Sequence, residues 1–458
     1  MNNTERTLVS MNPATSEVID RYPTMTDDKV DAILSESEDA YRSWRHEPIQ
    51  GRAGKLRDLA EILRNRAQDY ALAITREMGK PISESMAEII KCADTCDYYA
   101  VHGEEFLAEA PSPSDSPKSS VCFAPLGIVL GIMPWNYPFW QVIRFAAPSL
   151  VAGNVAVLKH ASNVTGCSLA LQDAFHDAGF PPGTFRSLIV AGSAVERVIA
   201  DSRVSAVSLT GSDTVGRRVG AIAGEHLKKS VLELGGSDAF VVLDDADVES
   251  AARTAVKARF QNCGQSCIAA KRYIVEEAIA DEFEDQVIAL TRALKVGDPE
   301  NLETELGPLA RADLREELER QLRATASEGA VLRTGGGRPN RRGFFFEPTI
   351  LTNCEPNMVA CREETFGPLA VVIRVGNDEE ALRVANETRY GLGGAIWSSN
   401  SDRAESMARR METGGVFING MTHSAPGIPF GGIKDSGYGR ELSSFGVREF
   451  VNVKTLWR

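Results

Sequence analysis

The sequence predicts an α/β protein built on two doubly wound sheets. Short apolar segments typical of buried strands alternate with helical segments, in one series that ends near residue 243 and in a second that begins near residue 272. The chain has 458 residues, more than a single hydrophobic core of about 250–300 residues can organise. We therefore expect two large domains and a small appendage.

The opening third of the chain is expected to be helical. Apolar residues fall on one helical face over residues 26–44, and Leu56, Leu59 and Leu63 begin a second segment with the same period. Residues 111–117 then combine closely spaced prolines with small polar residues, which support neither a helix nor a strand ladder. We expect an exposed linker there.

The two alternating series place the strands. In the first series we expect strands at 127–133, 155–159, 185–190, 204–209 and 239–243. In the second series we expect them at 272–275, 368–375, 394–397 and 415–418. This alternation is typical of parallel sheets with helices on both faces. Because ligands often bind where two domains meet, we expect the functional cleft between them.

Composition and charge narrow the classes of partner. The chain is 43% hydrophobic and 25% charged, and its formal net charge of -13 argues against nucleic acid or an anionic membrane as the main partner. Residues 1–6 lack the apolar core of a signal peptide and no apolar run could span a bilayer, so the cytoplasm is the expected location. The eight cysteines and six histidines show no disulfide framework and no metal-ligand spacing, so we expect no metal site.

The segment most informative about chemistry is Phe-Gln-Asn-Cys-Gly-Gln-Ser-Cys at residues 260–267. It places Cys267 after a Gly-Gln turn that follows an apolar helical run at residues 248–260, so the sulfur would project from a fixed backbone. A thiolate attacks carbonyl carbon, and it needs a group that takes the proton of the thiol. Glu233 is a candidate for that base. Taken alone, a cysteine is more often a buried structural residue than a nucleophile, and only the surrounding segment favours the nucleophile for Cys267.

Four segments together resemble the aldehyde dehydrogenase superfamily. They are residues 260–267, Glu-Leu-Gly-Gly at 233–236, Pro-Trp-Asn-Tyr-Pro at 134–138 and Pro-Phe-Gly-Gly-Ile-Lys-Asp-Ser-Gly at 429–437. The resemblance extends from about Met11 to the last residues, with the segments in the family's order. Residues 135–141 and 159–163 look most like the shorter bacterial succinate-semialdehyde dehydrogenases.

The resemblance implies two Rossmann-like domains and an oligomerisation element. The cofactor-binding domain would comprise residues 1–118 and 132–234, and the catalytic domain residues 235–438. A small β element formed by residues 119–131 and 439–458 would join subunits into a homodimer or a homotetramer. The implied substrate is a small aldehyde.

A dinucleotide site is implied where a strand leads into a helix at residues 209–216. A helix N-terminus suits phosphate, although this segment alone is neither the usual G-x-G-x-x-G nor a P-loop. By the resemblance, Gly211 and Ser212 approach the pyrophosphate and Lys159 binds the adenosine ribose. Ser162 stands where NAD-preferring relatives often carry a glutamate that would repel a 2′-phosphate. We therefore expect NADP to be favoured and leave NAD open.

On the nicotinamide side, the resemblance assigns Glu364 to the ribose and Phe366 to the ring. A carboxylate suits a ribose diol, and an aromatic face limits movement of the ring. The remaining residues assigned to the cofactor are Trp135, Leu234 and Gly235.

The resemblance also implies oxidation of an aldehyde to a carboxylic acid. Cys267 would attack the aldehyde to give a thiohemiacetal, whose oxyanion would be held by the Asn136 side chain and the Cys267 backbone N–H. Hydride transfer to the nicotinamide would leave a thioester. Glu233 would then activate water, and its apolar neighbours would raise its pKa toward a useful range.

Substrate choice depends on charged groups near the nucleophile. Arg144 occupies the position of the arginine that holds the substrate carboxylate in succinate-semialdehyde dehydrogenases, which favours succinate semialdehyde. Gln261 stands where longer members carry a second arginine, and this departure leaves other short aliphatic aldehydes and semialdehydes open. Arg259, His423 and Ser424 could compensate for it.

Three further hypotheses remain. An acylating dehydrogenase that releases acyl-CoA is disfavoured by Glu233, because a base that activates water competes with thiolysis. A non-catalytic binding member is disfavoured because Cys267, Glu233 and Asn136 are all present. Finally, Cys263 could form a reversible disulfide with Cys267, the alternative being a small buried Cys263.

Overall fold

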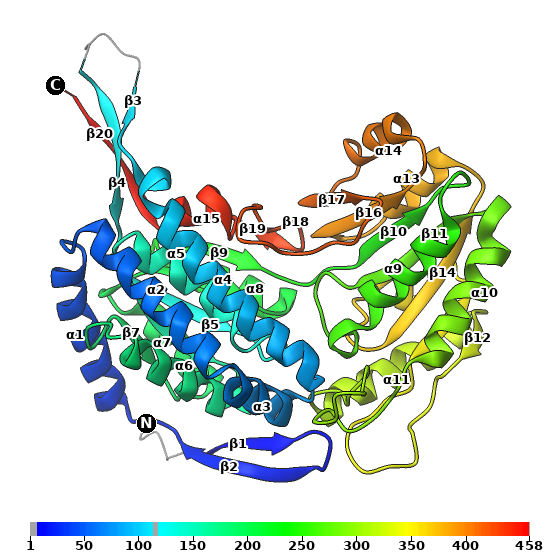
Figure 1. Cartoon of the computed structure of the whole chain (residues 1–458), viewed down its shortest axis with the longest axis horizontal. Coiled ribbons are helices and arrows are strands. Elements are labelled where there is room, and N and C mark those ends of the chain that lie inside the picture. Colours follow the sequence, from blue (N-terminus) through cyan, green and yellow to red (C-terminus); the bar gives the residue numbers. More distant parts are fainter. Residues whose placement is uncertain (1–6, 113–117, 458) are drawn as a thin grey trace.

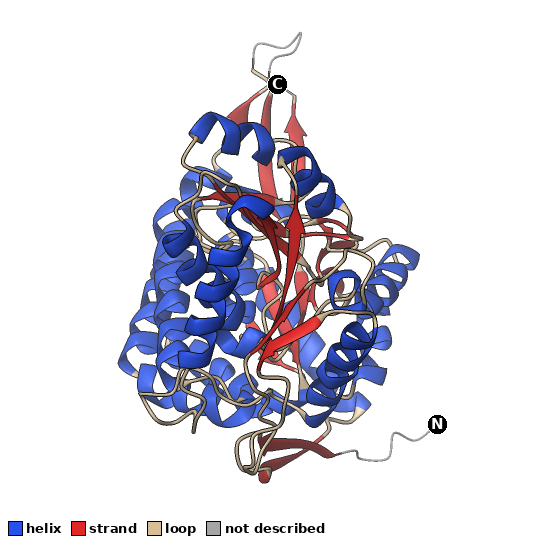
Figure 2. Ribbon diagram, turned by 90° about the vertical axis from the view of Figure 1, so that its right-hand side faces the viewer, coloured by secondary structure: helices blue, strands red, loops and turns tan. Residues whose placement is uncertain are grey.

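Two large sheets with helices packed around them form the body of the protein. The computed structural model describes residues 7–112 and 118–457. Its two largest sheets have six and seven strands and lie side by side (Figure 1), and helices flank the strands on both sides (Figure 2). The prediction of two doubly wound α/β domains is confirmed.

The six-stranded sheet forms the first half. Its order is β19-β9-β8-β5-β6-β7, and its strands pair in parallel except for β19. The strands are β5 (Ile128–Met133), β6 (Val155–His160), β7 (Phe185–Ser187), β8 (Val204–Thr210), β9 (Lys229–Glu233) and β19 (Gly437–Tyr438). Every residue of β5 is buried, as expected for a parallel strand covered on both faces.

Helices of the opening third pack on this sheet together with those of its crossovers. They are α1 (Asp27–Trp44), α2 (Ile49–Asn65), α3 (Ala67–Met78), α4 (Ile82–Leu107), α5 (Trp140–Val151), α6 (Thr165–Asp177), α7 (Val195–Ala200) and α8 (Asp213–Glu225). Helix α1 begins where the Thr26 side chain accepts from Lys29 N, and its apolar face is buried as the period predicts. The predicted helical opening is confirmed.

A hairpin that the sequence analysis did not predict precedes α1. It consists of β1 (Thr7–Asn12) and β2 (Glu17–Pro23), which pair antiparallel. Nearly every residue of β2 is exposed, so this strand has no buried face and its sequence shows no apolar period of two.

The seven-stranded sheet forms the second half, in the order β12-β13-β14-β11-β10-β16-β17 with β12 antiparallel to its neighbour. Its strands are β10 (Asp238–Val242), β11 (Ala270–Glu276), β12 (Val331–Thr334), β13 (Thr349–Thr352), β14 (Leu369–Val375), β16 (Gly393–Trp397) and β17 (Gly415–Ile418). Its helices are α9 (Val248–Phe260), α10 (Glu277–Ala293), α11 (Ala312–Ser327), α12 (Val359–Arg362), α13 (Asp378–Asn386) and α14 (Ser401–Ala408). A short pair, β15 (Tyr390–Gly391) and β18 (Ile433–Lys434), lies beside them.

A three-stranded sheet, here called the arm, projects from the first half and carries the C-terminal strand (Figure 1). It contains β3 (Ala110–Pro111), β4 (Ser120–Pro125) and β20 (Val451–Leu456). The pairing of β4 with β20 joins the two segments that the sequence assigned to the oligomerisation element.

The boundaries expected for that element, 119–131 and 439–458, need correction. Strand β5 pairs with β6 and β8 inside the six-stranded sheet, because its buried apolar residues require helices on both faces. Helix α15 (Ser443–Glu449) packs against α4 and α5, outside the arm. Strand β3, expected in the cofactor domain, pairs with β4. Residues 113–117 of the predicted linker lie outside the described residues.

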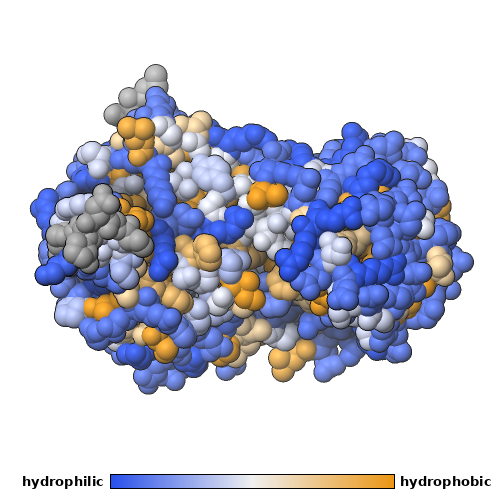
Figure 3. Space-filling model, turned by 90° about the horizontal axis from the view of Figure 1, so that it is seen from above, coloured by the Kyte–Doolittle hydropathy of each residue, from blue (hydrophilic) through white to orange (hydrophobic). Residues whose placement is uncertain are grey.

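The face shown in Figure 3 is mainly hydrophilic, with hydrophobic side chains in small groups. None of the helices in the described part of the chain combines the length and hydropathy needed to cross a bilayer. Among residues 7–112 and 118–457, no three His, Cys, Asp or Glu side chains come together in a group that could hold a metal ion.

Candidate active site

A cavity of about 790 Å³ lies between the two halves and includes the Cys267 side chain. Its walls come from α4 and α5 of the first half, from α9 of the second half and from the loop at residues 421–424. This is the interface where the sequence predicted the cleft, and clefts between domains are the usual places for small-molecule chemistry.

Cys267 is presented by the turn that ends α9. The helix begins at the Asp247 cap and ends at Phe260, as predicted, and a 3₁₀ turn follows at Gln261–Gly264. Two residues of this turn, Asn262 and Cys263, have φ angles of 51° and 56°, which non-glycine residues seldom adopt. The chain therefore reverses sharply just before Cys267, as the Gly-Gln segment suggested.

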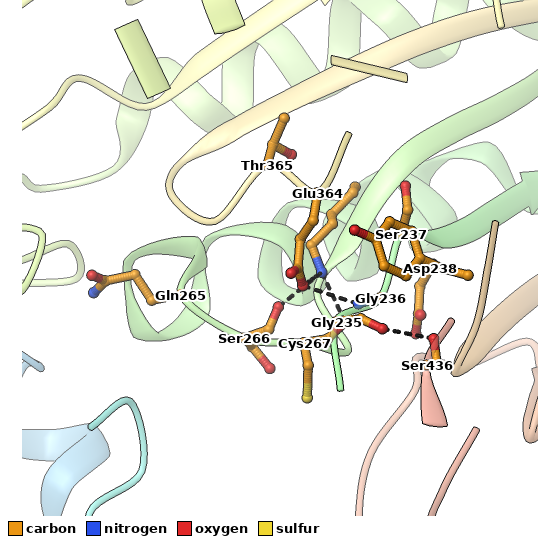
Figure 4. A network of polar contacts seen from close by, with 12 residues as sticks. Gly235, Gly236, Ser237, Asp238, Gln265, Ser266, Cys267, Glu364, Thr365 and Ser436 are labelled. Carbon is orange, nitrogen blue, oxygen red and sulfur yellow. Dashed lines mark hydrogen bonds and ion pairs between the residues drawn. The ribbon is translucent and has the colours of Figure 1, made fainter. Parts of the chain in front are cut away.

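A buried lysine fixes the backbone on either side of Cys267. Lys271 Nζ donates to the Cys267 carbonyl oxygen at 2.7 Å and to the Ser266 carbonyl oxygen at 3.0 Å. The same ammonium lies 3.3 Å from Oε1 of Glu364, which accepts from Gly236 N at 3.0 Å. Figure 4 shows the Cys267 sulfur pointing away from this network. The network holds the backbone and leaves the thiol directed elsewhere.

The turn after β9 packs directly on the backbone of Cys267. A Cβ at Gly236 would lie 2.5 Å from the Cys267 carbonyl oxygen, so this position has no room for a side chain. Ser436 Oγ donates to the Gly235 carbonyl oxygen at 2.6 Å and fixes the same turn (Figure 4). Two predicted motifs that are distant in sequence therefore meet in space.

Burial raises the pKa of Cys267 to about 12, while the charges of Arg144 and Lys271 act in the opposite direction. The group is therefore a thiol at neutral pH in this state. Because the thiolate is the nucleophile, a reaction at this sulfur requires a base or a nearby positive charge.

Asn136 lies beside the turn that carries Cys267. Its Nδ2 donates to the Gln265 carbonyl oxygen at 3.0 Å, and Asn262 Nδ2 donates to the Asn136 carbonyl oxygen at 2.8 Å. An amide carries two N–H donors, so one remains for a second acceptor near Cys267. The structure thus places Asn136 against the turn that precedes Cys267, and its role toward an oxyanion stays a prediction.

Glu233 ends β9 as a buried carboxyl, and neither of its oxygens has a hydrogen-bond partner among the described residues. Burial raises the pKa of Glu233 well above its usual range, and the charge of Glu441 adds to the effect, whereas Arg144 opposes it. The position that a Cβ at Gly431 would take lies 2.5 Å from Oε1, so the carboxyl packs against bare backbone. The negative charge of the Glu233 carboxylate also raises the pKa of the Cys267 thiol.

The residues predicted for the adenosine side of a dinucleotide gather at one edge of the six-stranded sheet. Strands β6 and β8 run parallel to β5, so their carboxyl ends share an edge. Ser212 caps α8 there, accepting from Val215 N at 3.4 Å, directly after Gly211. Lys159 lies near the end of β6, where burial lowers the pKa of its ammonium. Ser162 follows on the exposed surface.

The residues predicted for the nicotinamide side lie near Cys267. Glu364 contacts the Gly235–Gly236 turn, since it accepts from Gly236 N. The rings of Phe366 and Trp135 meet edge-on with centroids 5.7 Å apart. Leu234 is buried next to the turn, and its side chain occupies the space a Cβ at Gly216 would need.

The predicted substrate residues have different surroundings. Arg144 lines the cavity on α5, but it is buried and forms an ion pair with Glu441, and its Nη2 donates to Thr210 Oγ1 at 3.2 Å. Gln261 and Ser424 also line the cavity. Arg259 does not: its guanidinium is fully buried and donates to the carbonyl oxygens of residues 264, 365, 367 and 369. The suggestion that Arg259 compensates for Gln261 is therefore wrong.

Three residues that the sequence analysis did not single out take part in this site. Lys91 lines the cavity, Lys271 holds the Cys267 backbone, and Glu441 pairs with Arg144. Lys91 comes from α4, far in sequence from every motif, and a lysine on an amphipathic helix gives no local signal. Lys271 follows Cys267 by four residues and is the second residue of a buried strand, a position that could have marked it.

Cys263 lies in the core of the second half, and its Sγ accepts from Gly307 N at 3.1 Å. Cys267 instead packs against the core of the first half, and both cysteines are free thiols. Burial also raises the pKa of the Cys263 thiol. The structure favours the alternative, a small buried Cys263, and the reversible disulfide stays a prediction.

Comparison with known proteins places the chain in a family. A model of the aldehyde dehydrogenase family matches residues 1–456. A probable NADP-dependent succinate-semialdehyde dehydrogenase of Synechocystis is 46% identical over 450 residues, 98% of this chain and 99% of that protein. The NAD(P)-dependent succinate semialdehyde dehydrogenase Sad of Escherichia coli is also 46% identical over 450 residues, with 98% of this chain and 97% of that protein covered.

The fold agrees with solved structures. The succinic semialdehyde dehydrogenase of Streptococcus pyogenes, determined with NADP as its cofactor, superposes with a TM-score of 0.97 at 38% identity and covers 98% of this chain and 99% of its own. A family model that spans nearly the whole chain and relatives of this identity lead to one conclusion. The chain belongs to the aldehyde dehydrogenase family.

Proposed function

We propose that this protein oxidises succinate semialdehyde to succinate, with NADP favoured and NAD as a second cofactor. The observation that carries the proposal is that one cavity holds Cys267 together with several cationic side chains, among them Arg144 and Lys91 from the helices of the first half. A thiol suits the aldehyde end of such a substrate and cations suit its carboxylate end. The names of the Synechocystis and Escherichia coli relatives agree with this substrate.

In the first step, the Cys267 thiol releases its proton to water, and the thiolate attacks the aldehyde carbon to form the oxyanion of a thiohemiacetal. The free N–H of the Asn136 amide and the Cys267 backbone N–H stabilise the oxyanion, a contribution worth about 100-fold or more in rate per donor. The nearby charges of Arg144 and Lys271 favour the thiolate against its burial. A bound nicotinamide supplies the hydride acceptor for the oxidation.

In the second step, Glu233 takes a proton from the water that cleaves the thioester on Cys267. A raised pKa suits this role, because a carboxylate that holds a proton near neutral pH is a stronger base. The Gly236 backbone packs against the Cys267 carbonyl oxygen. This contact holds the turn after Glu233 next to Cys267, the residue that would carry the thioester. The same base disfavours an acylating enzyme, since it directs water to the thioester.

The residues present fit a dinucleotide. Lys159 is a largely buried ammonium with no hydrogen-bond or ion-pair partner among the described residues, and a ribose hydroxyl would give it one. Ser162 offers a hydroxyl at the exposed end of the same segment. A 2′-phosphate meets no acidic side chain at that position, which favours NADP. Glu364 and Phe366 would hold the nicotinamide side near Cys267.

We also propose that the protein works as a homodimer or a homotetramer in the cytoplasm. The arm projects from the body and exposes apolar side chains, among them Val453 at 60% and Trp457 at 64%. Exposed apolar side chains on a projecting sheet suit pairing with a second subunit.

Steady-state kinetics on a panel of aldehydes, with NAD and NADP separately, test the proposal. We expect kcat/KM for succinate semialdehyde to exceed that for butanal, its neutral four-carbon counterpart, by about tenfold or more, and NADP to give the higher efficiency. A preference for butanal, or for glutarate semialdehyde over succinate semialdehyde, would contradict the assigned substrate.

A further inference from the structure

Lys91 points a cationic side chain into the cavity that holds Cys267. It projects from α4, which forms one wall, and its Nζ donates to Oγ of Ser424, in the loop that lines the same cavity, at 2.8 Å. The ammonium also lies 4.0 Å from the ring centroid of Trp140 on α5. Three separate segments thus fix its position.

The charge of Lys91 has no anionic partner among the described residues. No carboxylate of the described chain lies within ion-pair distance of its Nζ, and its hydrogen-bond partner Ser424 is neutral. Lys80 on the segment before α4 is different, because it is buried in an ion pair with Glu88. A largely buried ammonium that faces a cavity without a counter-ion suits an anionic ligand.

Arg144 is a weaker candidate for the same task. Its guanidinium already pairs with the buried carboxylate of Glu441, donates to Thr210 and lies 4.6 Å from the ring centroid of Phe430. A carboxylate that bound Arg144 would compete with Glu441 for the same cation. Lys91 and Ser424 together offer an ammonium and a hydroxyl, two donors that a carboxylate can accept from at once.

We infer that Lys91, paired with Ser424, is the main anchor for the far carboxylate of the substrate. This inference rests on the proposed function, because it assumes an aldehyde that carries an anionic group. Arg144 then acts mainly through its ion pair with Glu441, which joins α5 to the C-terminal segment.

The charge state of Lys91 agrees with this role. Burial lowers the pKa of Lys91 to about 8, the nearby charge of Arg144 adds to the effect, and Cys92 and Glu88 oppose it. The group is still mainly charged at pH 7, and a bound carboxylate would favour the charged form further.

The test compares kcat/KM for succinate semialdehyde and for butanal in the wild type and in three variants of the full-length protein. Lys91→Met removes the charge and keeps the length of the side chain, and Lys91→Arg keeps the charge. Lys257→Met is the matched control, because Lys257 is an exposed lysine on α9 at the same cavity.

We expect Lys91→Met to lower kcat/KM for succinate semialdehyde about 10–100-fold, mainly through KM, with butanal changed less than about twofold. Lys91→Arg should recover most of the loss, and Lys257→Met should show little. The inference is overturned if Lys91→Met keeps the wild-type ratio between the two substrates, if it lowers both alike, or if Lys257→Met loses as much.

The design also separates the inference from the proposed function. A wild type that shows no preference for succinate semialdehyde over butanal refutes the proposed substrate and the inference with it. A wild type that shows the preference, combined with a Lys91→Met variant that keeps it, refutes the inference alone.

Discussion

Burial raises the pKa of both the Cys267 thiol and the Glu233 carboxyl. In the proposed mechanism the first step needs a thiolate and the last step needs a carboxylate base. We propose that the two roles are separable, because the thiol would act before the oxidation and the carboxylate after it.

Replacing Glu233 with Gln should therefore affect the second step. We expect steady-state turnover to fall by about 100-fold or more, while a burst of reduced cofactor equal to the enzyme concentration still forms at close to the wild-type rate. Stopped-flow absorbance of the reduced nicotinamide measures both phases. An equal loss of the burst rate and the steady-state rate would show that Glu233 also serves the attack by Cys267.

At this scale the sequence singled out candidate residues that stand in local motifs, and it missed side chains that meet across elements. Cys267, Glu233 and Asn136 stand in such motifs, and their roles stay predictions. Lys91 and Glu441 contact residues of other elements, and no local spacing encodes such contacts. The expectation that Arg259 compensates for Gln261 was wrong for the same reason. Arg259 directly precedes residues 260–267, but its guanidinium donates to backbone carbonyl oxygens in the core.

The ion pair between Arg144 and Glu441 ties α5 to the segment that precedes α15. Both side chains are fully buried, and Glu441 also acts on the pKa of Glu233. This contact connects the C-terminal segment, which continues into β20 of the arm, with the wall of the cavity.

We expect Arg144→Ala to destabilise the protein and to impair both substrates. Removing one partner of a buried ion pair leaves an uncompensated carboxylate and costs about 3–5 kcal/mol. The midpoint of thermal unfolding at pH 7 should fall, and kcat/KM should fall for butanal as well as for succinate semialdehyde.

The double variant Arg144→Met with Glu441→Gln is the control for the buried charge, and it should regain much of the lost stability. An Arg144→Ala protein with a wild-type melting midpoint, and with a loss confined to succinate semialdehyde, would mean that Arg144 is the carboxylate anchor instead of a structural partner.

Elements were predicted from sequence where their residues have a clear period. Helix α9 and strand β14 have nearly the expected bounds because one shows a helical face and the other a continuous apolar run. The bounds predicted for the arm were wrong. Strands β4 and β5 are separated by only two residues, and the sequence alone does not show that they enter different sheets.

In the whole molecule, the two halves contribute different parts of the proposed site. The edge of the six-stranded sheet carries the predicted adenosine residues, and the second half carries Cys267 on the turn after α9. The cavity with Lys91 and Arg144 lies between them. Cofactor binding should therefore survive a change at Cys267 that abolishes the chemistry.

The most direct test of this account is the turnover of Cys267→Ala with succinate semialdehyde and NADP, measured together with NADP binding by isothermal titration calorimetry. Removing the nucleophile should lower kcat by about 1000-fold or more and abolish the burst, while the dissociation constant for NADP stays within about twofold of the wild type. Substantial residual turnover in this variant would mean that another residue attacks the aldehyde and would contradict the central claim.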